Sequence, residues 1–394
     1  MGELKKKLRE EIRQSFSYRE HMSDEDIAEI IDQKIMEQRT KQTMSLKERL
    51  KLQRELFDSF RRLDILQELV DNPEITEIMI NGPDEIFVES GGKIGRWGGG
   101  TFESKEQLLD LIQQVVGQVN RIVNTSSPIA SARLENGSRV QVVLEPVALN
   151  GPILTIRKFP ERITMERLIQ YGSISEEAAM FLKAATDARY NIFVSGGTGA
   201  GKTTFLNALS DFIPRDERVI TIEDSAELQL SHIANLVRLE TRDANAEGEG
   251  AIGIGELIRA SLRMRPDRII IGEVRGKETL DLLQAMNTGH DGSFSTGHGN
   301  SVRDMLSRLE TMVLMGMDLP LPAIRSQIAS AVDLMVHVAR LRDRSRKVVA
   351  IEEVTGIENG EIVLNPLFSF VEGHLEKTGS LENCEKLRLA GYRL

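Results

Sequence analysis

The stretch NIFVSGGTGAGKTTFLNAL, residues 191–209, decides the fold. Its first part, residues 191–195, is a short apolar run typical of a buried strand. Its last part, residues 204–209, is typical of a helix. The glycine-rich run between them matches the phosphate-loop pattern G-x-x-x-x-G-K-[ST]. The sequence therefore predicts a strand, a phosphate loop and a helix in succession.

The chemistry of this loop predicts a nucleotide and a metal ion as ligands. Glycines allow successive backbone N–H groups to face a phosphate, and the following helix adds its positive N-terminal end. The Lys202 ammonium would reach the β- and γ-phosphates, and the Thr203 hydroxyl is a hard oxygen ligand for Mg²⁺. The alternative is a glycine-rich turn without a ligand. We therefore predict ATP and Mg²⁺ at Gly196, Gly197, Thr198, Gly199, Ala200, Gly201, Lys202, Thr203 and Thr204.

Two acidic strand ends supply groups that hydrolysis needs. An isoleucine run, residues 269–271, leads to Glu273, which would hold Mg²⁺ through water and polarise the attacking water. The strand predicted at 218–223 ends in a second acidic cluster, in which Glu223 is the predicted general base and Glu227 the next candidate. The alternatives are a solvated carboxylate for Glu273 and a helix cap for the second cluster.

Histidines and arginines complete the candidates. His290 and His298 lie in one segment of small residues, where a strand end can bring an imidazole close to a phosphate. Zinc binding and core packing are the alternatives for this pair. Arginines can stabilise transition-state charge, although a surface ion pair is the alternative for each. The candidate arginines are Arg238, Arg242, Arg133, Arg139 and Arg157.

The chain divides into three regions that differ in composition and in the spacing of their apolar residues. Residues 1–60 are charged, with isoleucines at helical spacing, and predict a helical region that is either an arm or a partner-recruiting module. Residues 61–160 combine short strands with a helix and an Asn-Gly turn at 136–137, typical of a small α/β domain. Residues 161–394 alternate strands with helices, which predicts a mostly parallel sheet with helices on both faces. The predicted fold class is α/β.

Composition and charge narrow the functional class. The 394 residues include 50 Lys and Arg against 60 Asp and Glu, a formal net charge of −10, so nucleic acid is not an expected partner. The one cysteine, Cys384, cannot form an internal disulfide and fits a reducing compartment. The opening segment is charged, and no apolar stretch reaches the length of a membrane span. We therefore expect neither a secretory signal nor a direct membrane span.

Four motifs in order make the sequence similar to the secretion and pilus ATPases of the type II/type IV secretion superfamily. They are the Walker A loop (196–203), the Asp box ITIEDSAEL (220–228), the Walker B strand RIIIGEVRG (268–276) and the His box TGHDGSFSTGHGNS (288–301). Three segments of the smaller domain resemble the CpaF branch, the ATPases of tight-adherence (Tad) pili. They are residues 74–89, 131–140 and 151–159.

The resemblance implies a RecA-like P-loop core, preceded by a small PAS-like domain and an N-terminal helical segment. It implies a homohexamer, with ATP between the two domains of a protomer. It also implies a Mg²⁺-dependent motor for pilus assembly or protein secretion, cytoplasmic and docked on an inner-membrane platform protein. The matching residues are Lys202 and Thr203 for phosphate and Mg²⁺, Glu223 for the Asp-box acid, Glu273 for the Walker B acid, His298 for the phosphate sensor, Arg238 and Arg242 for the paired arginines, and Arg157 for a small-domain arginine that reaches the nucleotide.

Two other functions stay open on the sequence. One is a nucleic-acid-translocating motor on the same RecA-like core, which the net charge and the absence of interleaved basic and aromatic residues disfavour. The other is a nucleotide-gated scaffold without meaningful turnover, which the two acidic strand ends and the His box disfavour.

Overall fold

The chain forms two compact units, residues 1–161 and 162–394. The computed structural model describes residues 2–16, 23–39, 44–117, 122–134, 136–159, 162–242, 244 and 249–392. The boundary that the sequence predicts, near residues 160 and 161, lies outside these ranges.

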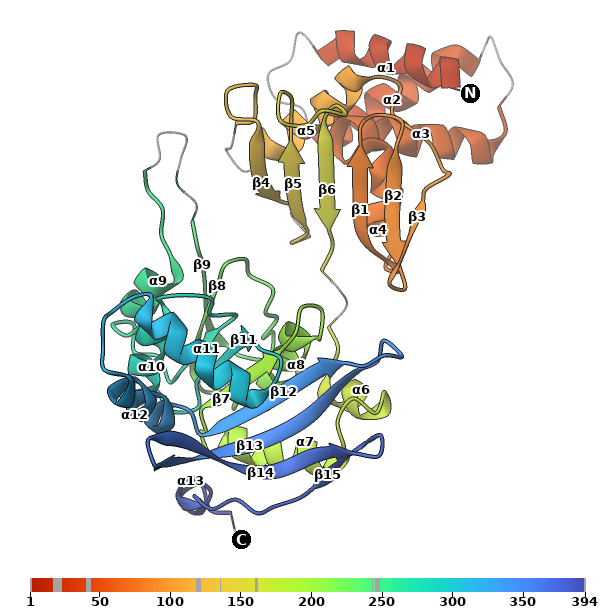
Figure 1. The fold of residues 1–394 in the computed structure, drawn as a ribbon. Helices are drawn as coiled ribbons and strands as arrows, with labels where there is room; N and C mark the ends of the chain where they lie inside the picture. The colour runs from red at the N-terminus through yellow and green to blue at the C-terminus, as the bar shows by residue number, and fades with distance from the viewer. Residues whose placement is uncertain are drawn as a thin grey trace. The chain divides into compact units, whose positions relative to one another are not determined.

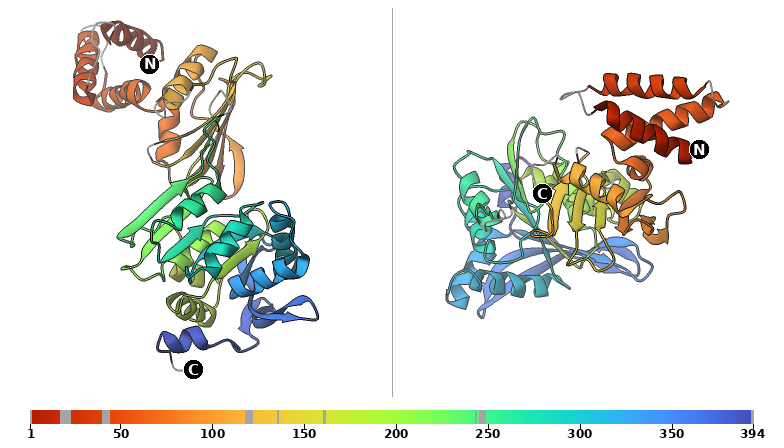
Figure 2. Two further views of the ribbon diagram at one scale, coloured as in Figure 1. Left: turned by 90° about the vertical axis from the view of Figure 1, so that its left-hand side faces the viewer. Right: turned by 90° about the horizontal axis from the view of Figure 1, so that it is seen from above.

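Three helices open the first unit and pack on one another (Figures 1 and 2). Reciprocal hydrogen bonds between Ser23 and Asp26 cap the second helix, because each backbone N–H is accepted by the other's side chain. Apolar residues at helical spacing form a small core of Leu8, Ile12, Ile27, Ile31, Ile35, Leu52 and Leu56. The helices are α1 (Gly2–Phe16), α2 (Asp24–Arg39) and α3 (Leu46–Arg61).

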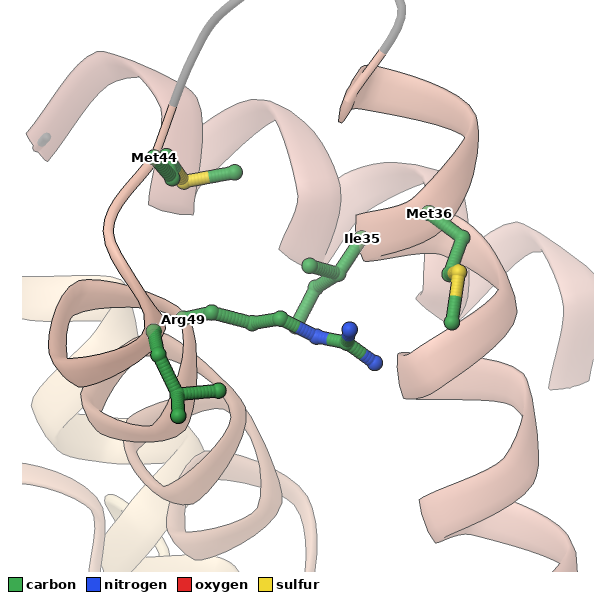
Figure 3. A pocket seen from close by; sticks show the side chains of 5 residues that line it. Ile35, Met36, Met44 and Arg49 are labelled. Atoms are coloured by element: carbon green, nitrogen blue, oxygen red, sulfur yellow. The ribbon is translucent and has the colours of Figure 1, made fainter.

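A small pocket of about 90 Å³ lies between α2 and α3. Figure 3 shows the Arg49 side chain pointing across it toward α2, near Ile35 and Met36. The Arg49 guanidinium also lies 3.4 Å from an Asp32 carboxylate oxygen, which fixes its direction. The pocket is therefore part of the packing between these two helices.

A six-stranded antiparallel sheet completes the first unit, with the strand order β3-β2-β1-β6-β5-β4. One face, which includes Ile78, Val140 and Ile156, packs on the helices and forms the core of this part. The elements are η1 (Asp64–Leu66), α4 (Gln67–Asp71), β1 (Ile75–Asn81), β2 (Ile86–Ser90), β3 (Lys93–Arg96), α5 (Lys105–Gly117), β4 (Ile129–Arg133), β5 (Arg139–Val143) and β6 (Ile153–Arg157).

Three arginines lie side by side on the other face of this sheet. Arg133 pairs with Arg139 in register, and Arg139 pairs with Arg157. Their neighbours in the sequence, such as Ile156, point into the core, so the arginines point away from it. Glu77 continues the row on β1. Like charges directly opposite each other are unfavourable in a sheet, and the Phe159 ring beneath Arg133 and the Glu77 carboxylate opposite Arg157 offset part of this cost.

A nine-stranded sheet with the order β15-β14-β13-β12-β7-β11-β10-β8-β9 organises the second unit. The six strands from β12 to β9 are parallel, and β13, β14 and β15 extend the sheet as an antiparallel meander. The strands are β7 (Ile192–Gly196), β8 (Arg218–Glu223), β9 (Asn235–Glu240), β10 (Arg268–Ile271), β11 (Phe294–His298), β12 (Leu334–Arg340), β13 (Arg346–Glu358), β14 (Glu361–Val371) and β15 (His374–Lys377).

Helices cover both faces of this sheet, as the sequence predicts. On β7, Ile192 and Val194 belong to the core that includes α6, α7 and α8, whereas Phe193 belongs to the core that includes α9 to α12. Figure 1 shows α10, α11 and α12 grouped on one side of the strands. The helices are α6 (Met165–Gln170), α7 (Glu176–Asp187), α8 (Lys202–Ser210), α9 (Ile254–Ser261), α10 (Thr279–Asn287), α11 (Val302–Leu314), α12 (Leu321–Ala331) and α13 (Glu385–Leu389). Within the described ranges, no helix combines the length and the apolar character needed to cross a membrane.

Candidate active site

Four neighbouring parallel strands bring the predicted groups to one edge of the sheet. β7 leads into the loop before Lys202, β11 ends at His298, β10 leads to Glu273 and β8 ends at Glu223. The carboxyl ends of parallel strands meet at the same edge, which is where open α/β sheets bind their ligands. These four side chains come together for that topological reason, although up to 96 residues separate them in the sequence.

The phosphate loop needs glycine at two positions for different reasons. Gly201 adopts φ 95° as the residue before α8, in the left-handed region that favours glycine. At Gly196 a Cβ would lie 2.4 Å from the Val338 carbonyl oxygen, so no side chain fits there. The loop is therefore pressed against β12 while its N–H groups stay available at the start of α8.

Lys202 is buried at the centre of the loop and donates to backbone oxygens. Its ammonium lies 3.3 Å from the Gly196 carbonyl and 3.4 Å from the Gly197 carbonyl, both within the phosphate loop. Burial lowers the pKa of Lys202, although the nearby Glu273 carboxylate opposes that shift. A cation held this way has weak partners, and an incoming phosphate group would offer it stronger, charge-assisted bonds.

His298 bridges Lys202 and Glu273. Its Nδ1 lies 3.1 Å from the Lys202 ammonium, which can only donate, and its Nε2 lies 2.9 Å from Glu273 Oε1. These partners assign the neutral imidazole with its proton on Nε2. Burial lowers the pKa of His298, against the attraction of Glu273, which agrees with the neutral form. The three groups form one polar chain across the edge of the sheet.

Arg275 holds the other oxygen of Glu273. Its guanidinium donates to Glu273 Oε2 from Nε at 3.0 Å and from Nη2 at 2.7 Å, a two-pronged contact. Arg275 also lies 3.6 Å from Asp224, beside the end of β8. Glu273 is two residues past the end of β10, which stops at Ile271. It is oriented by Arg275 and His298 more than by the strand.

Glu223 is the most buried acid at this edge, with 3% exposure. Its Oε1 accepts hydrogen bonds from the backbone N–H groups of Glu227 at 2.8 Å and Leu228 at 3.0 Å. Its Oε2 is buried and has no hydrogen-bond partner. Burial raises the pKa of Glu223 to about 7, although the two backbone bonds and Arg238 oppose this shift. A carboxylate with a pKa near neutrality and one uncommitted oxygen can take a proton.

The remaining predicted residues lie in different places. The backbone N–H of Glu227 donates to Glu223 Oε1 and so positions that carboxylate. Arg238 is exposed on β9, and Arg242 lines an open hollow of about 500 Å³ that Asp224 and Arg275 also line. Arg157 lies on β6 in the first unit.

The two histidines of the His box lie at opposite edges of the sheet. His290 precedes β11, and its Nδ1 lies 3.2 Å from the Ala285 carbonyl oxygen, whereas His298 ends that strand. A strand of five residues separates the two by more than the reach of a shared ion. Across the described parts of the chain, no group of three or more His, Cys, Asp or Glu side chains is placed to hold a metal ion.

Two polar contacts of the phosphate loop are absent from the sequence-based candidates. Ser195 Oγ, on β7, lies 2.8 Å from His337 Nδ1 on β12, and both are buried. Arg346, at the start of β13, donates from Nε to the Gly199 carbonyl at 2.9 Å. His337 and Arg346 both belong to the C-terminal strands, and no sequence motif predicts where those strands lie in the sheet. The arginine-rich run at 340–347 is the signal that could have identified Arg346.

Comparisons with known proteins agree with this geometry. A family model described as "Type II/IV secretion system protein" matches residues 61–392. The conjugal transfer protein TrbB of Rhizobium radiobacter is 33% identical over 318 residues, covering 78% of this chain and 92% of TrbB. The type IV secretion system protein VirB11 of Brucella abortus is 34% identical over 305 residues, covering 70% and 84%.

A solved structure shares the fold. The structure of the pilus retraction motor PilT with bound ADP aligns with a TM-score of 0.54 and 20% identity, over 83% of this chain and 85% of PilT. At this identity the likeness concerns the fold, and it confirms the predicted RecA-like α/β core.

Proposed function

Because this chain belongs to the type II/IV secretion system protein family, we propose that it is an ATP hydrolase whose turnover drives a secretion or pilus machine. The observation that carries the proposal is the meeting of Lys202, His298, Glu273 and Glu223 at one edge of the sheet. A buried cation on a phosphate loop binds the nucleotide, and two acids of different environment divide the remaining work.

The two acids have different proposed roles. Glu273 forms an ion pair with Arg275 and contacts His298, so its proposed role is to orient the groups around the phosphate. Glu223 has a raised pKa and a buried oxygen without a partner, so it is the general base that takes a proton from the attacking water. His298 would report the phosphate, since it touches both Lys202 and Glu273.

The residues fit a magnesium ion as the metal. Mg²⁺ takes oxygen ligands, keeps several waters and uses few protein groups, so it needs no cluster of acidic side chains. Thr203 offers a half-buried hydroxyl at the start of α8, and Glu273 offers a carboxylate on the same edge. When bound, Mg²⁺ would neutralise phosphate charge. Thr203 and Glu273 would hold it, the latter through water.

The machine that we propose is a tight-adherence pilus or a related secretion system. The sequence segments of the smaller domain support this branch, and Arg157, in the arginine row of that domain, is proposed to bind the nucleotide. Arg238 and Arg242 are proposed to stabilise phosphate charge. We propose a homohexamer in the cytoplasm, docked on an inner-membrane platform protein. Copurification with that protein from membranes would test the docking, and its failure under conditions that preserve the machine would refute it.

Two variants test the enzymatic proposal. Lys202→Ala is expected to lose nucleotide binding, since it removes the cation of the loop, whereas Glu273→Gln is expected to bind ATP and lose turnover. Binding of a fluorescent ATP analogue and release of phosphate are the measurements. A Glu273→Gln protein that hydrolyses ATP like the parent would refute the role of Glu273.

One alternative cargo follows from the relatives. TrbB is named for conjugal transfer, and conjugation moves DNA, so a motor that acts on nucleic acid is the second candidate. The net charge of −10 disfavours it. Strong stimulation of ATP hydrolysis by single-stranded DNA would favour this candidate over the secretion or pilus motor.

A further inference from the structure

The hairpin that joins β12 to β13 carries the densest positive charge in the second unit's described sequence. Residues 340–347 contain five cations and one acid, a local charge of +4 in a chain whose net charge is −10. The hairpin extends past the last parallel pair between Val338 and Gly196 on β7 (Figure 1). Its cations are therefore presented beyond the body of the sheet.

The arginines of this hairpin repel one another and have few neutralising neighbours. Arg340 and Arg346 are directly opposite in the register of β12 and β13, an arrangement that costs stability when both are charged. Asp343 accepts from the Ser345 backbone and hydroxyl, at 2.9 and 2.7 Å, and so closes the turn. In the described ranges, no carboxylate lies within ion-pair distance of Arg340, Arg342, Arg344 or Arg346.

We propose that this basic hairpin, residues 340–347, binds an acidic segment of a partner protein. Arginine side chains in a fixed row suit carboxylates, because each guanidinium can form two parallel hydrogen bonds. The hairpin contains no aromatic residue on which bases could stack, and its one large apolar residue, Leu341, is half-buried. These features disfavour single-stranded nucleic acid and insertion into a membrane surface.

The hairpin also touches the phosphate loop, so binding there is linked to the nucleotide site. Arg346 donates to the Gly199 carbonyl, and a Cβ on Gly201 would lie 3.2 Å from Arg346 Cδ. A partner carboxylate that binds the Arg346 guanidinium competes with its hydrogen bond to the Gly199 carbonyl. The acidic partner is therefore expected to change the KM for ATP.

The test measures binding of a fluorescein-labelled polyglutamate peptide to the full chain without nucleotide, by anisotropy. Replacing Arg342 and Arg344 with glutamine is expected to weaken binding at least about tenfold. The matched control replaces Arg263 and Arg265, an exposed pair at the other edge of the sheet. Each pair includes one residue with positive φ, 70° at Arg344 and 55° at Arg265, so the backbone demands are similar.

The outcomes separate the hairpin from general charge effects. Loss of binding in the hairpin variant with retention in the control supports the proposal. Equal loss in both variants, or tighter binding of oligo-dT or phosphatidylglycerol vesicles than of polyglutamate, would overturn it. Because binding is read without nucleotide, the result does not depend on whether the chain hydrolyses ATP. An unchanged KM for ATP in the presence of saturating peptide would overturn the link through Arg346.

Discussion

The parallel strands of the nine-stranded sheet begin at one side, here called the amino edge, and end at the other, here called the carboxyl edge. The two sides use the same kinds of side chain in opposite ways. At the amino edge, the fully buried Arg268 is bound by Glu217, the Thr186 carbonyl and the Gly292 carbonyl. At the carboxyl edge, Lys202 contacts two backbone carbonyls and an imidazole, with the Glu273 carboxylate at 4.0 Å, and Glu223 keeps one buried oxygen without a partner. Buried charge with complete partners holds a structure, whereas buried charge with incomplete partners is available to a ligand.

Further contacts at the amino edge connect separate elements of the second unit; this set of contacts is called the amino-edge lock below. Lys386, in α13, donates to Asp333 at 2.7 Å and to Asp291 at 2.8 Å, and Asp333 also accepts from the Asn191 backbone at 2.7 Å. Strands β7 and β12 and the C-terminal helix are tied together there. The comparison therefore predicts that substitutions at the carboxyl edge change turnover, and that substitutions at the amino edge change stability.

The largest expected effect is on turnover. Glu223→Gln removes the proposed general base, so ATP hydrolysis is expected to fall by about 10²–10⁴-fold. The amide keeps the volume and can still accept from the Glu227 N–H, so nucleotide binding and the unfolding midpoint should stay near those of the parent. The measurements are phosphate release and binding of a fluorescent ATP analogue. Turnover within a factor of two of the parent would contradict the role.

The second effect is on stability at the amino edge. Glu217→Gln leaves the Arg268 guanidinium buried without its charge partner, and breaking a buried pair costs about 3–5 kcal/mol of unfolding free energy. Urea unfolding measures the loss, and turnover per folded molecule should be unchanged. Arg189→Ala is the control. Its side chain is 45% exposed beside the same Glu217, so its loss should cost about 0–1 kcal/mol.

A smaller loss is expected at Glu353, which anchors the C-terminal segment. Its Oε1 accepts from the Asn383 N–H at 2.7 Å, and its Oε2 accepts from the Glu382 N–H at 2.8 Å and Asn365 Nδ2 at 2.9 Å. In Glu353→Gln one oxygen becomes a donor that faces other donors, which costs about 1–3 kcal/mol. Thermal unfolding measures the change. A variant as stable as the parent would show that Glu353 does not anchor the C-terminal segment.

The sequence predicts the carboxyl edge far better than the amino edge. The motifs that end at Lys202, Glu223, Glu273 and His298 identify the residues that meet, since parallel strands place their ends together. The family was predicted from the same motifs, and the match over residues 61–392 confirms it. The site roles of these residues stay predictions.

The amino-edge lock and the antiparallel meander were not predicted. Lys386 meets Asp333 across 53 residues and Asp291 across 95, and no local pattern specifies such pairs. Asn359-Gly360 and Glu372-Gly373, all at positive φ, form the turns from β13 to β14 and from β14 to β15, so the meander carries hairpin signals that were not interpreted as such. His337 on β12 contacts Ser195 on β7, and Arg346 at the start of β13 contacts Gly199 in the phosphate loop; both contacts depend on how the C-terminal strands are placed, which no local pattern specifies.

The smallest expected effect concerns the pH dependence of the carboxyl edge. Burial raises the pKa of Glu223 to about 7, so the ionised base is present above that pH and is lost as the pH falls. The kcat/KM for ATP should therefore decline through an acid limb near pH 7 instead of near the ordinary value for glutamate. For stability the sign is reversed, because the folded state favours the protonated form and its contribution fades as the pH rises through 7.

An Arg238 variant distinguishes the titration of Glu223 from the titration of ATP itself. The positive charge of Arg238 on β9 lowers the pKa of Glu223, so Arg238→Ala should move the acid limb to higher pH, by less than about one unit since the arginine is exposed. Titration of ATP itself would leave the limb in place. Arg263→Ala, at the amino edge, is the control for lost charge. A limb that is the same in the parent and in both variants would mean that a group other than Glu223 sets the pH dependence.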